Sequence, residues 1–301
     1  MRKTTAAISA LALSAIALTG CSTAPGSSAG CERGDSALLT NAMKVTGDLG
    51  AAKVSLTTPV RTSKILSDDL ITGHGLAVTE SEQNAVGTIT FLNGATGQVL
   101  QNGAGVWSPK NLDQQFAGLG DALQCATQGS RIAFAVPAKS LPQGLADQVG
   151  MSGDDSLVGI IDLQEVLLPK ATGTDVFNDA QGLPSVVRAP GGQPGIIIPD
   201  GAAPTKTVTQ TLIRGEGAKV GDGLAMFQYT SVGWADRKEI DSSWTKGVVT
   251  DTTTLPKEVM AQVQKATVGS QLMVVVPGKS GDATVYVVDV LGIVPPELTG
   301  K

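Results

Sequence analysis

Residues 212–230 read LIRGEGAKVGDGLAMFQYT. The run joins an apolar segment to a Gly-Glu-Gly turn and then to a second apolar segment, which is typical of two strands linked by a tight connection. Residues 70–78 read LITGHGLAV and share with 212–220 the Leu-Ile pair, both glycines and the final valine, at an offset of 142. The stretch therefore predicts paired strands and indicates an internal repeat.

Two further pairs of segments repeat in the same order. Residues 129–140, GSRIAFAVPAKS, match 269–280, GSQLMVVVPGKS, at an offset of 140. Residues 158–168, VGIIDLQEVLL, match 285–295, VYVVDVLGIVP, at an offset of 127. The drop in offset indicates that the second copy lacks 13 residues present in the loop at about 140–156 of the first.

The repeat predicts two tandem domains, at residues 32–170 and 176–296. Strands are expected in the second copy where apolar residues alternate or run together, at 207–213, 224–230, 271–276 and 284–294. A leading proline and apolar residues on one face predict a short helix at 256–266, with a counterpart at 112–126. We expect an α+β fold in which each domain is an antiparallel twisted sheet wrapped on one short helix.

Composition narrows the function classes. Among 301 residues, 37 glycines, 15 prolines and only 16% charged residues argue against long helices. The formal net charge of -5 argues against a nucleic-acid partner, which calls for a basic surface. His74 is the single histidine, which excludes multi-histidine metal sites. We therefore expect no nucleic-acid partner, and the sequence implies no metal and no cofactor.

The N-terminus indicates the compartment. Arg2 and Lys3 precede an apolar segment at 4–19, too short to span a bilayer, and Leu18-Thr19-Gly20-Cys21 resembles a bacterial lipobox. This resemblance implies a signal peptide at 1–20, acyl chains such as palmitate on Cys21, and a lipidated tether at 21–31. We expect lipid anchoring on the extracytoplasmic face of the cell membrane. The alternative is an ordinary secretory signal with a chance cysteine.

Two cysteines remain beyond the lipobox. Cys31 and Cys125 lie 94 positions apart, and an even pair in an oxidising exterior favours a disulfide. Closing so long a loop stabilises the fold by roughly 4 kcal/mol in the chain-entropy model. Two unpaired thiols are the alternative.

Six landmarks follow one another over about 90 residues of the second copy. They are Gly215-Glu216-Gly217 with Val220-Gly221-Asp222, Tyr229-Thr230, KEIDSS at 238–243, Val268-Gly269-Ser270, Val276-Pro277, and TVYVVDVL at 284–291. In this order they resemble an FKBP-type peptidyl-prolyl cis-trans isomerase (rotamase) domain. With the lipobox, the cysteine pair and the doubled domain, the chain resembles the tandem FKBP-type lipoproteins of actinobacteria. The first copy resembles this family mainly through its likeness to the second copy.

The resemblance implies a proline pocket. Tyr229 matches the pocket tyrosine and Asp241 the aspartate beside the substrate carbonyl, so these two are the catalytic candidates. The expected substrate-binding residues are Ile240, Lys246, Leu255, Val259 and Tyr286, with Phe116 and Leu119 of the first copy. Tyr229 and Tyr286 as ordinary sheet-core aromatics, and Asp241 as a turn or cap acid, are the alternatives.

Both copies depart from the family pattern. Pro256 has no N–H where the family has a donor, Val259 replaces the tryptophan floor, and the second copy lacks the flap. In the first copy Val99-Leu100 replaces the Phe-Asp pair, and Gly159 replaces the last-strand aromatic. Phe91 or Thr90 lies near the tyrosine position there, and the floor of that copy keeps a backbone N–H.

The chemistry of such an enzyme needs no nucleophile, metal or proton transfer. Rotation about a peptide bond crosses a barrier of about 18–20 kcal/mol, and a dry apolar pocket favours the twisted amide over the planar one. We expect a membrane-anchored isomerase of low efficiency that assists protein folding by acting on proline-containing segments of exported proteins. A non-catalytic FKBP-fold binding lipoprotein and a structural lipoprotein without peptide affinity are the alternatives.

Overall fold

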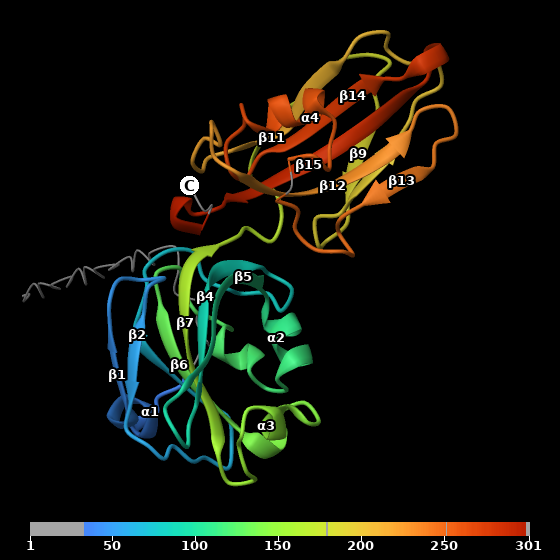
Figure 1. The fold of residues 1–301 in the computed structure, drawn as a ribbon. Coiled ribbons are helices and arrows are strands. Elements are labelled where there is room, and N and C mark those ends of the chain that lie inside the picture. The colour runs from blue at the N-terminus through green and yellow to red at the C-terminus, as the bar shows by residue number, and fades with distance from the viewer. Residues whose placement is uncertain (1–32, 179, 251, 299–301) are drawn as a thin grey trace, which may run out of the picture.

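The computed structural model describes residues 33–178, 180–250 and 252–298. The described strands form two large antiparallel sheets that share no strand (Figure 1) and two two-stranded ribbons. We refer to residues 33–168 as the first half and 173–298 as the second half. The predicted signal peptide at 1–20 and tether at 21–31, with Cys21 and Cys31, lie outside the described residues and stay predictions.

The elements of the first half are α1 (Ala37–Ala42), β1 (Met43–Thr46), β2 (Lys53–Leu56), β3 (Leu66–Ile71), β4 (Ala85–Asn93), β5 (Val99–Trp107), α2 (Pro109–Gln115), η1 (Gly120–Ala122), β6 (Arg131–Pro137), η2 (Ala138–Ser140), α3 (Leu145–Gln148) and β7 (Ser156–Val166). Those of the second half are β8 (Gly173–Asp175), β9 (Ser185–Arg188), β10 (Pro194–Ile197), β11 (Val208–Gly215), β12 (Ala225–Gly233), β13 (Glu239–Ser242), α4 (Lys257–Val263), β14 (Gln271–Pro277), η3 (Lys279–Gly281), β15 (Ala283–Ile293) and η4 (Pro296–Leu298). The strand orders of the large sheets are β3-β6-β7-β4-β5 and β13-β12-β15-β14-β11-β8, and the ribbons are β1–β2 and β9–β10. The four strands expected in the second copy are confirmed as β11, β12, β14 and β15.

Each sheet is covered on both faces. Every residue of β6 is buried, and alternate side chains enter two cores: Phe134 packs with Leu112 of α2, and Ala133 lies in the core against which Val45 of the β1–β2 ribbon packs. The same division holds in β14, where Val274 packs with Val259 of α4 and Met273 joins the core that receives Ile196 of the β9–β10 ribbon. A helical side and a ribbon side therefore flank each sheet.

The two sheets repeat one register. The β4–β7 ladder shifts between Val86 and Gly87, and the β12–β15 ladder shifts between Met226 and Phe227, 140 residues on. The β3–β6 and β11–β14 ladders shift at positions 142 residues apart, just before Ile71 and Ile213. Because equal irregularities fall at equal places, the internal repeat extends from sequence to backbone geometry.

The helices differ between the halves. The helix expected at 256–266 is α4, whereas the helix expected at 112–126 is wrong, because α2 ends at Gln115 and only η1 follows. Gly118 adopts φ +89°, and a Cβ on Gly120 would lie 2.3 Å from the Pro109 carbonyl oxygen. The two glycines therefore end the helix and let the chain fold back on it.

The segment between the halves is tied to the second sheet. The Leu168 N–H donates to the Leu291 carbonyl at 3.0 Å, and the Thr172 N–H donates to the Gly269 carbonyl at 3.0 Å. Leu167 is fully buried in a cluster with Val86, Met226 and Leu291. No helix among the described residues is long and apolar enough to cross a membrane.

Candidate functional site

Tyr229 and Asp241 meet on one face of the β12–β13 pair. The register opposes Ser231 to Asp241, so Tyr229, two residues along β12, is a diagonal neighbour on the same face. The Tyr229 hydroxyl donates to Asp241 Oδ2 at 2.6 Å, and the Lys246 ammonium donates to Oδ1. The Ser242 N–H also donates to Oδ1, at 2.8 Å. The carboxylate therefore accepts from three donors on two oxygens.

These contacts fix the protonation states at neutral pH. The hydrogen bond from Lys246, followed by the one from Tyr229, lowers the pKa of Asp241 to about 2. Desolvation, followed by the hydrogen bond to Asp241, raises the pKa of Tyr229 to about 12. Asp241 is ionised and Tyr229 protonated over the whole physiological range, so the pair suits chemistry in which no proton is transferred.

An apolar cluster lies beneath this pair. Tyr229 packs in the same core as Leu255 and Val259, and Tyr286 packs against that core. Val259 is fully buried and Leu255 is 4% exposed, so these two predicted floor residues lie within the packed core. Burial raises the pKa of the half-buried Tyr286.

The solvent side of the site is polar. The Asp241 side chain is 40% exposed and the Lys246 side chain 67% exposed. Ile240, placed in the pocket by the resemblance, lies apart with 61% of its surface exposed. The ladder pairs Asp241 with Ser231 and Glu239 with Val232, so Ile240 is the extra residue of a bulge.

The first half has a cavity of about 260 Å³ between β4, β5 and α2. Phe91, Trp107 and Phe116 line it, and the Phe91 and Phe116 ring centroids are 5.4 Å apart. Phe116 is thus placed at a cavity, whereas Leu119 is fully buried in the core below. The Phe116 N–H donates to the Leu112 carbonyl at 2.7 Å, so this donor is already used.

The ladders establish which residues correspond between the halves. On the last strand of each sheet, Ile161 pairs with Ile89 and Val288 pairs with Tyr229. On the other side of β4 and β12, Gln101 pairs with Phe91 and Asp241 pairs with Ser231. Ile89 and Gln101 therefore take the places of Tyr229 and Asp241, in correction of the matches to Phe91 or Thr90 and to Val99-Leu100. The offset of 140, applied to Tyr229 and Asp241, was the signal that could have found them.

The first half has Gly159 where the family has an aromatic residue on the last strand, and an aromatic ring of the neighbouring strand β6 lies beside it. A Cβ on Gly159 would lie 2.3 Å from Cζ of Phe134, so the Phe134 ring occupies the space beside this glycine. The 140–156 loop, retained only in this half, packs Leu141 and Met151 into the same core. Among the described residues, no group of three or more His, Cys, Asp or Glu side chains could hold a metal ion.

Comparisons with known proteins return FKBP-type structures. The chain resembles the three FKBP domains of wheat FKBP73, with 14% identity over 76% of this chain and 94% of that one, at a TM-score of 0.33. It also resembles a peptidyl-prolyl cis-trans isomerase of Pseudomonas syringae, with 18% identity over 35% of this chain and 77% of that one, at 0.28. The N-terminal domain of FKBP42 from Arabidopsis thaliana matches with 12% identity over 40% and 98%, at 0.31.

No protein-family model and no curated protein matches the chain. The similar structures come from the family that the sequence landmarks resemble, and all three TM-scores lie below 0.5. We therefore argue function from the residues of this chain.

Proposed function

We propose that the chain is a membrane-anchored FKBP-type peptidyl-prolyl cis-trans isomerase of low efficiency, built from two tandem FKBP-like domains. Its substrates are proline-containing segments of exported proteins, and its catalytic site is in the second half. The observation that carries this proposal is the Tyr229–Asp241–Lys246 group set over an apolar core. Amide rotation breaks no bond to a proton and forms no covalent intermediate, so hydrogen-bonding groups beside an apolar wall suffice for it.

The geometry supports catalysis by environment. A planar amide has charge separation that the twisted transition state loses, so an apolar wall such as the Tyr229 ring favours the twisted form. The Lys246 ammonium carries three N–H donors and uses one on Asp241, which leaves donors for a substrate carbonyl. Asp241 accepts from both the hydroxyl and the ammonium, which orients these two donors before substrate arrives.

Low efficiency is expected from the surroundings of the group. Pro256 stands at the donor position without an N–H, and the second half has only the short η3 turn in place of the long loop. Leu255 and Val259 are packed in the core and therefore present little surface to a substrate proline. A substrate proline is therefore held by fewer contacts than in a complete pocket.

The cavity of the first half favours a second candidate function, non-catalytic binding of proline-containing peptides. Its aromatic lining of Phe91, Trp107 and Phe116 suits a proline ring, and no ionisable residue lines it. Ile89 and Gln101 supply neither the hydroxyl nor the carboxylate of the second half. This cavity can hold a peptide without the group to which we assign catalysis.

Anchoring completes the proposal. Lipid on Cys21 and a signal peptide at 1–20 account for the basic, apolar and Leu-Thr-Gly-Cys pattern of the N-terminus. Cys125 is disulfide-bonded, which supports its pairing with Cys31. Fractionation of cells expressing the wild type and Cys21→Ala tests the anchor. The wild type should stay with the membranes as a lipid-modified protein, and Cys21→Ala should lose the lipid.

Exchange NMR on a short peptide with one X-Pro bond tests the isomerase. The full chain should accelerate cis-trans exchange, and Asp241→Ala should lose most of the acceleration. Glu239→Ala is the matched control, because it removes an exposed acid from the same strand. Chemical-shift changes in the peptide without faster exchange would support the binding function alone. The absence of both signals would rule out both functions.

A further inference from the structure

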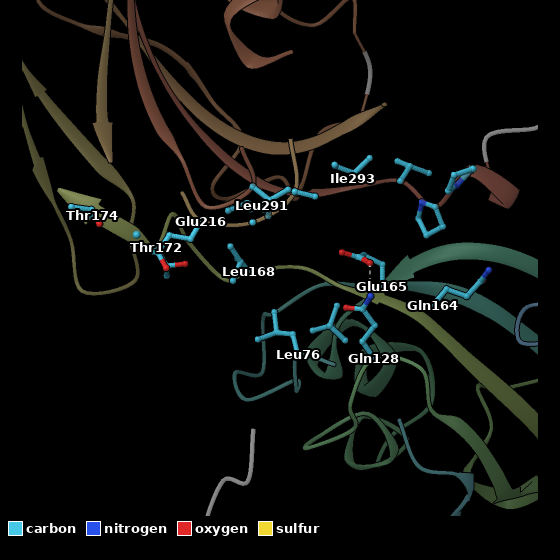
Figure 2. A pocket seen from close by; sticks show the side chains of 18 residues that line it. Leu76, Gln128, Gln164, Glu165, Leu168, Thr172, Thr174, Glu216, Leu291 and Ile293 are labelled. Atoms are coloured by element: carbon cyan, nitrogen blue, oxygen red, sulfur yellow. Dashed lines mark hydrogen bonds between the residues drawn. The ribbon is translucent and has the colours of Figure 1, made fainter. Parts of the chain in front are cut away.

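A cleft of about 910 Å³ lies between the two halves, away from both sites described above (Figure 2). Gln128 and Glu165 line it from the first half, Leu291 and Ile293 line it from the second, and Thr172 of the connecting segment also contributes. Its volume falls in the range of about 300–1,000 Å³ found for ligand pockets. Neither the Tyr229–Asp241 pair nor the aromatic cavity contributes a residue to it.

The base of the cleft is formed by close contact between the halves. A Cβ on Gly292 would lie 2.4 Å from Cδ2 of Leu167, so a larger residue there would displace the Leu167 side chain, and glycine lets β15 approach the end of the first half closely. The Leu168 N–H bonds to the Leu291 carbonyl beside it. The cleft is therefore preformed by packing and backbone hydrogen bonds.

The walls are mainly apolar. Side chains of Leu76, Leu168, Leu291, Ile293, Val294 and Pro295 line the space from both sides. Leu76 keeps 40% of its surface exposed, so apolar area remains available to a bound group. A ligand that fills the cleft would remove this area from water.

The charged groups of the cleft are all acidic. Gln128 Nε2 donates to Glu165 Oε2 at 2.7 Å, and Glu165 Oε1 lies 3.9 Å from where a Cβ on Gly292 would be. Glu216 is the other ionisable residue in the lining, which contains no Lys, Arg or His. None of the ion pairs among the described residues involves Glu165 or Glu216. Burial raises the pKa of Glu165, and a cation in the cleft would offset that desolvation.

We propose that this cleft is a further peptide site, separate from the two described above, which binds an extended segment with one basic side chain flanked by apolar residues. The basic group pairs with the Glu165 carboxylate, and the flanking side chains cover the apolar walls. Gly173 and Thr174 of β8 line the cleft, and β8 is the edge strand of the six-stranded sheet. An extended chain can align with such an edge through its backbone, which favours a peptide over a compact cation.

A double-mutant cycle tests the pairing in the full chain. The probes are two labelled peptides, acetyl-LVKVL-amide and acetyl-LVQVL-amide, and binding is read by fluorescence anisotropy. We expect the wild type to prefer the lysine peptide about tenfold, equal to about 1.4 kcal/mol, and Glu165→Gln to lose this preference. Glutamine can still accept from Gln128, and Glu80→Gln, an exposed acid elsewhere in the first half, is the matched control.

Two further variants locate the site. Leu76→Ser should weaken the binding of both peptides several-fold, because it removes part of the apolar wall without opening the core. Asp241→Ala should bind both peptides as the wild type does. The proposal would be overturned if the wild type bound neither peptide or bound both equally. It would also be overturned if Glu165→Gln kept the preference or if Asp241→Ala lost binding.

Discussion

The two halves of the chain share a backbone frame and differ in the side chains set into it. The Gly73 N–H donates to Ser130 Oγ at 2.9 Å, and the Gly215 N–H donates to Ser270 Oγ at 3.1 Å. Yet Tyr229 and Asp241 of one half correspond to Ile89 and Gln101 of the other. Turn geometry and strand register are therefore retained where the polar group of the candidate site is not, which shows that the frame alone does not specify the site.

A buried polar pair shows the same contrast. In the first half Arg131 bonds to Asp162 through two N–H groups, at 2.6 and 2.8 Å. At the equivalent place Gln271 Nε2 donates to Asp289 Oδ1 at 2.7 Å. Both acids also accept from a backbone N–H of the chain outside the sheet, Gly50 at 2.7 Å and Ala171 at 2.9 Å. An ion pair and a neutral amide thus anchor equivalent positions.

The largest expected effect is on stability, from Arg131→Ala. The Arg131 and Asp162 side chains are 3% and 1% exposed, so the variant leaves a buried carboxylate without its partner. We expect a loss of about 3–5 kcal/mol in the free energy of unfolding. Urea unfolding followed by fluorescence of Trp107, with Trp234 and Trp244 replaced by Phe in the background, measures it for the first half.

Gln271→Ala is the matched change in the second half. It removes a neutral donor from Asp289, and we expect a smaller loss of about 1–3 kcal/mol. Equal losses in the two halves, or a loss below about 1 kcal/mol for Arg131→Ala, would contradict the view that the two pairs differ in character.

The next largest effect is a pH dependence of the free energy of unfolding, caused by Asp289. Desolvation is the main cause that raises its pKa to about 6, so the folded state favours the protonated acid. Its stabilising contribution is complete below the unfolded pKa of about 4 and is lost as the pH rises through 6. We expect a wild-type gain of about 2–3 kcal/mol relative to Asp289→Asn between pH 7 and pH 4, read from urea unfolding. A constant difference between the two proteins would contradict this assignment.

The smallest expected effect is on the pKa of Asp241 in the candidate catalytic group. Lys246→Met should raise the pKa of Asp241 from about 2 toward its ordinary value, because the Lys246 hydrogen bond is the main cause of the lowering. Tyr229→Phe should raise it less. Carboxyl carbon shifts followed by NMR titration measure both, with Lys238→Met, an exposed lysine on the approach to β13, as the unchanged control.

Sequence patterns predicted the frame better than the site. Alternating apolar residues and paired glycines report faces and turns, so β11, β12, β14, β15 and α4 followed from them. They do not report a bulge, and Ile240 is exposed because one falls there. The break after Gln115 depends on how Gly118 and Gly120 close against α2, which is a tertiary contact. The cleft between the halves depends on packing across Gly292 and has no local signal in the sequence.

One measurement tests most directly whether catalysis belongs to the second half alone. Exchange NMR on an X-Pro peptide would compare the full wild-type chain with Asp241→Ala and with Phe116→Ala. We expect Asp241→Ala to lose most of the acceleration while the chemical-shift changes of the bound peptide persist, and Phe116→Ala to keep the acceleration while those changes weaken. Acceleration that survives Asp241→Ala, or that disappears with Phe116→Ala, would contradict this expectation.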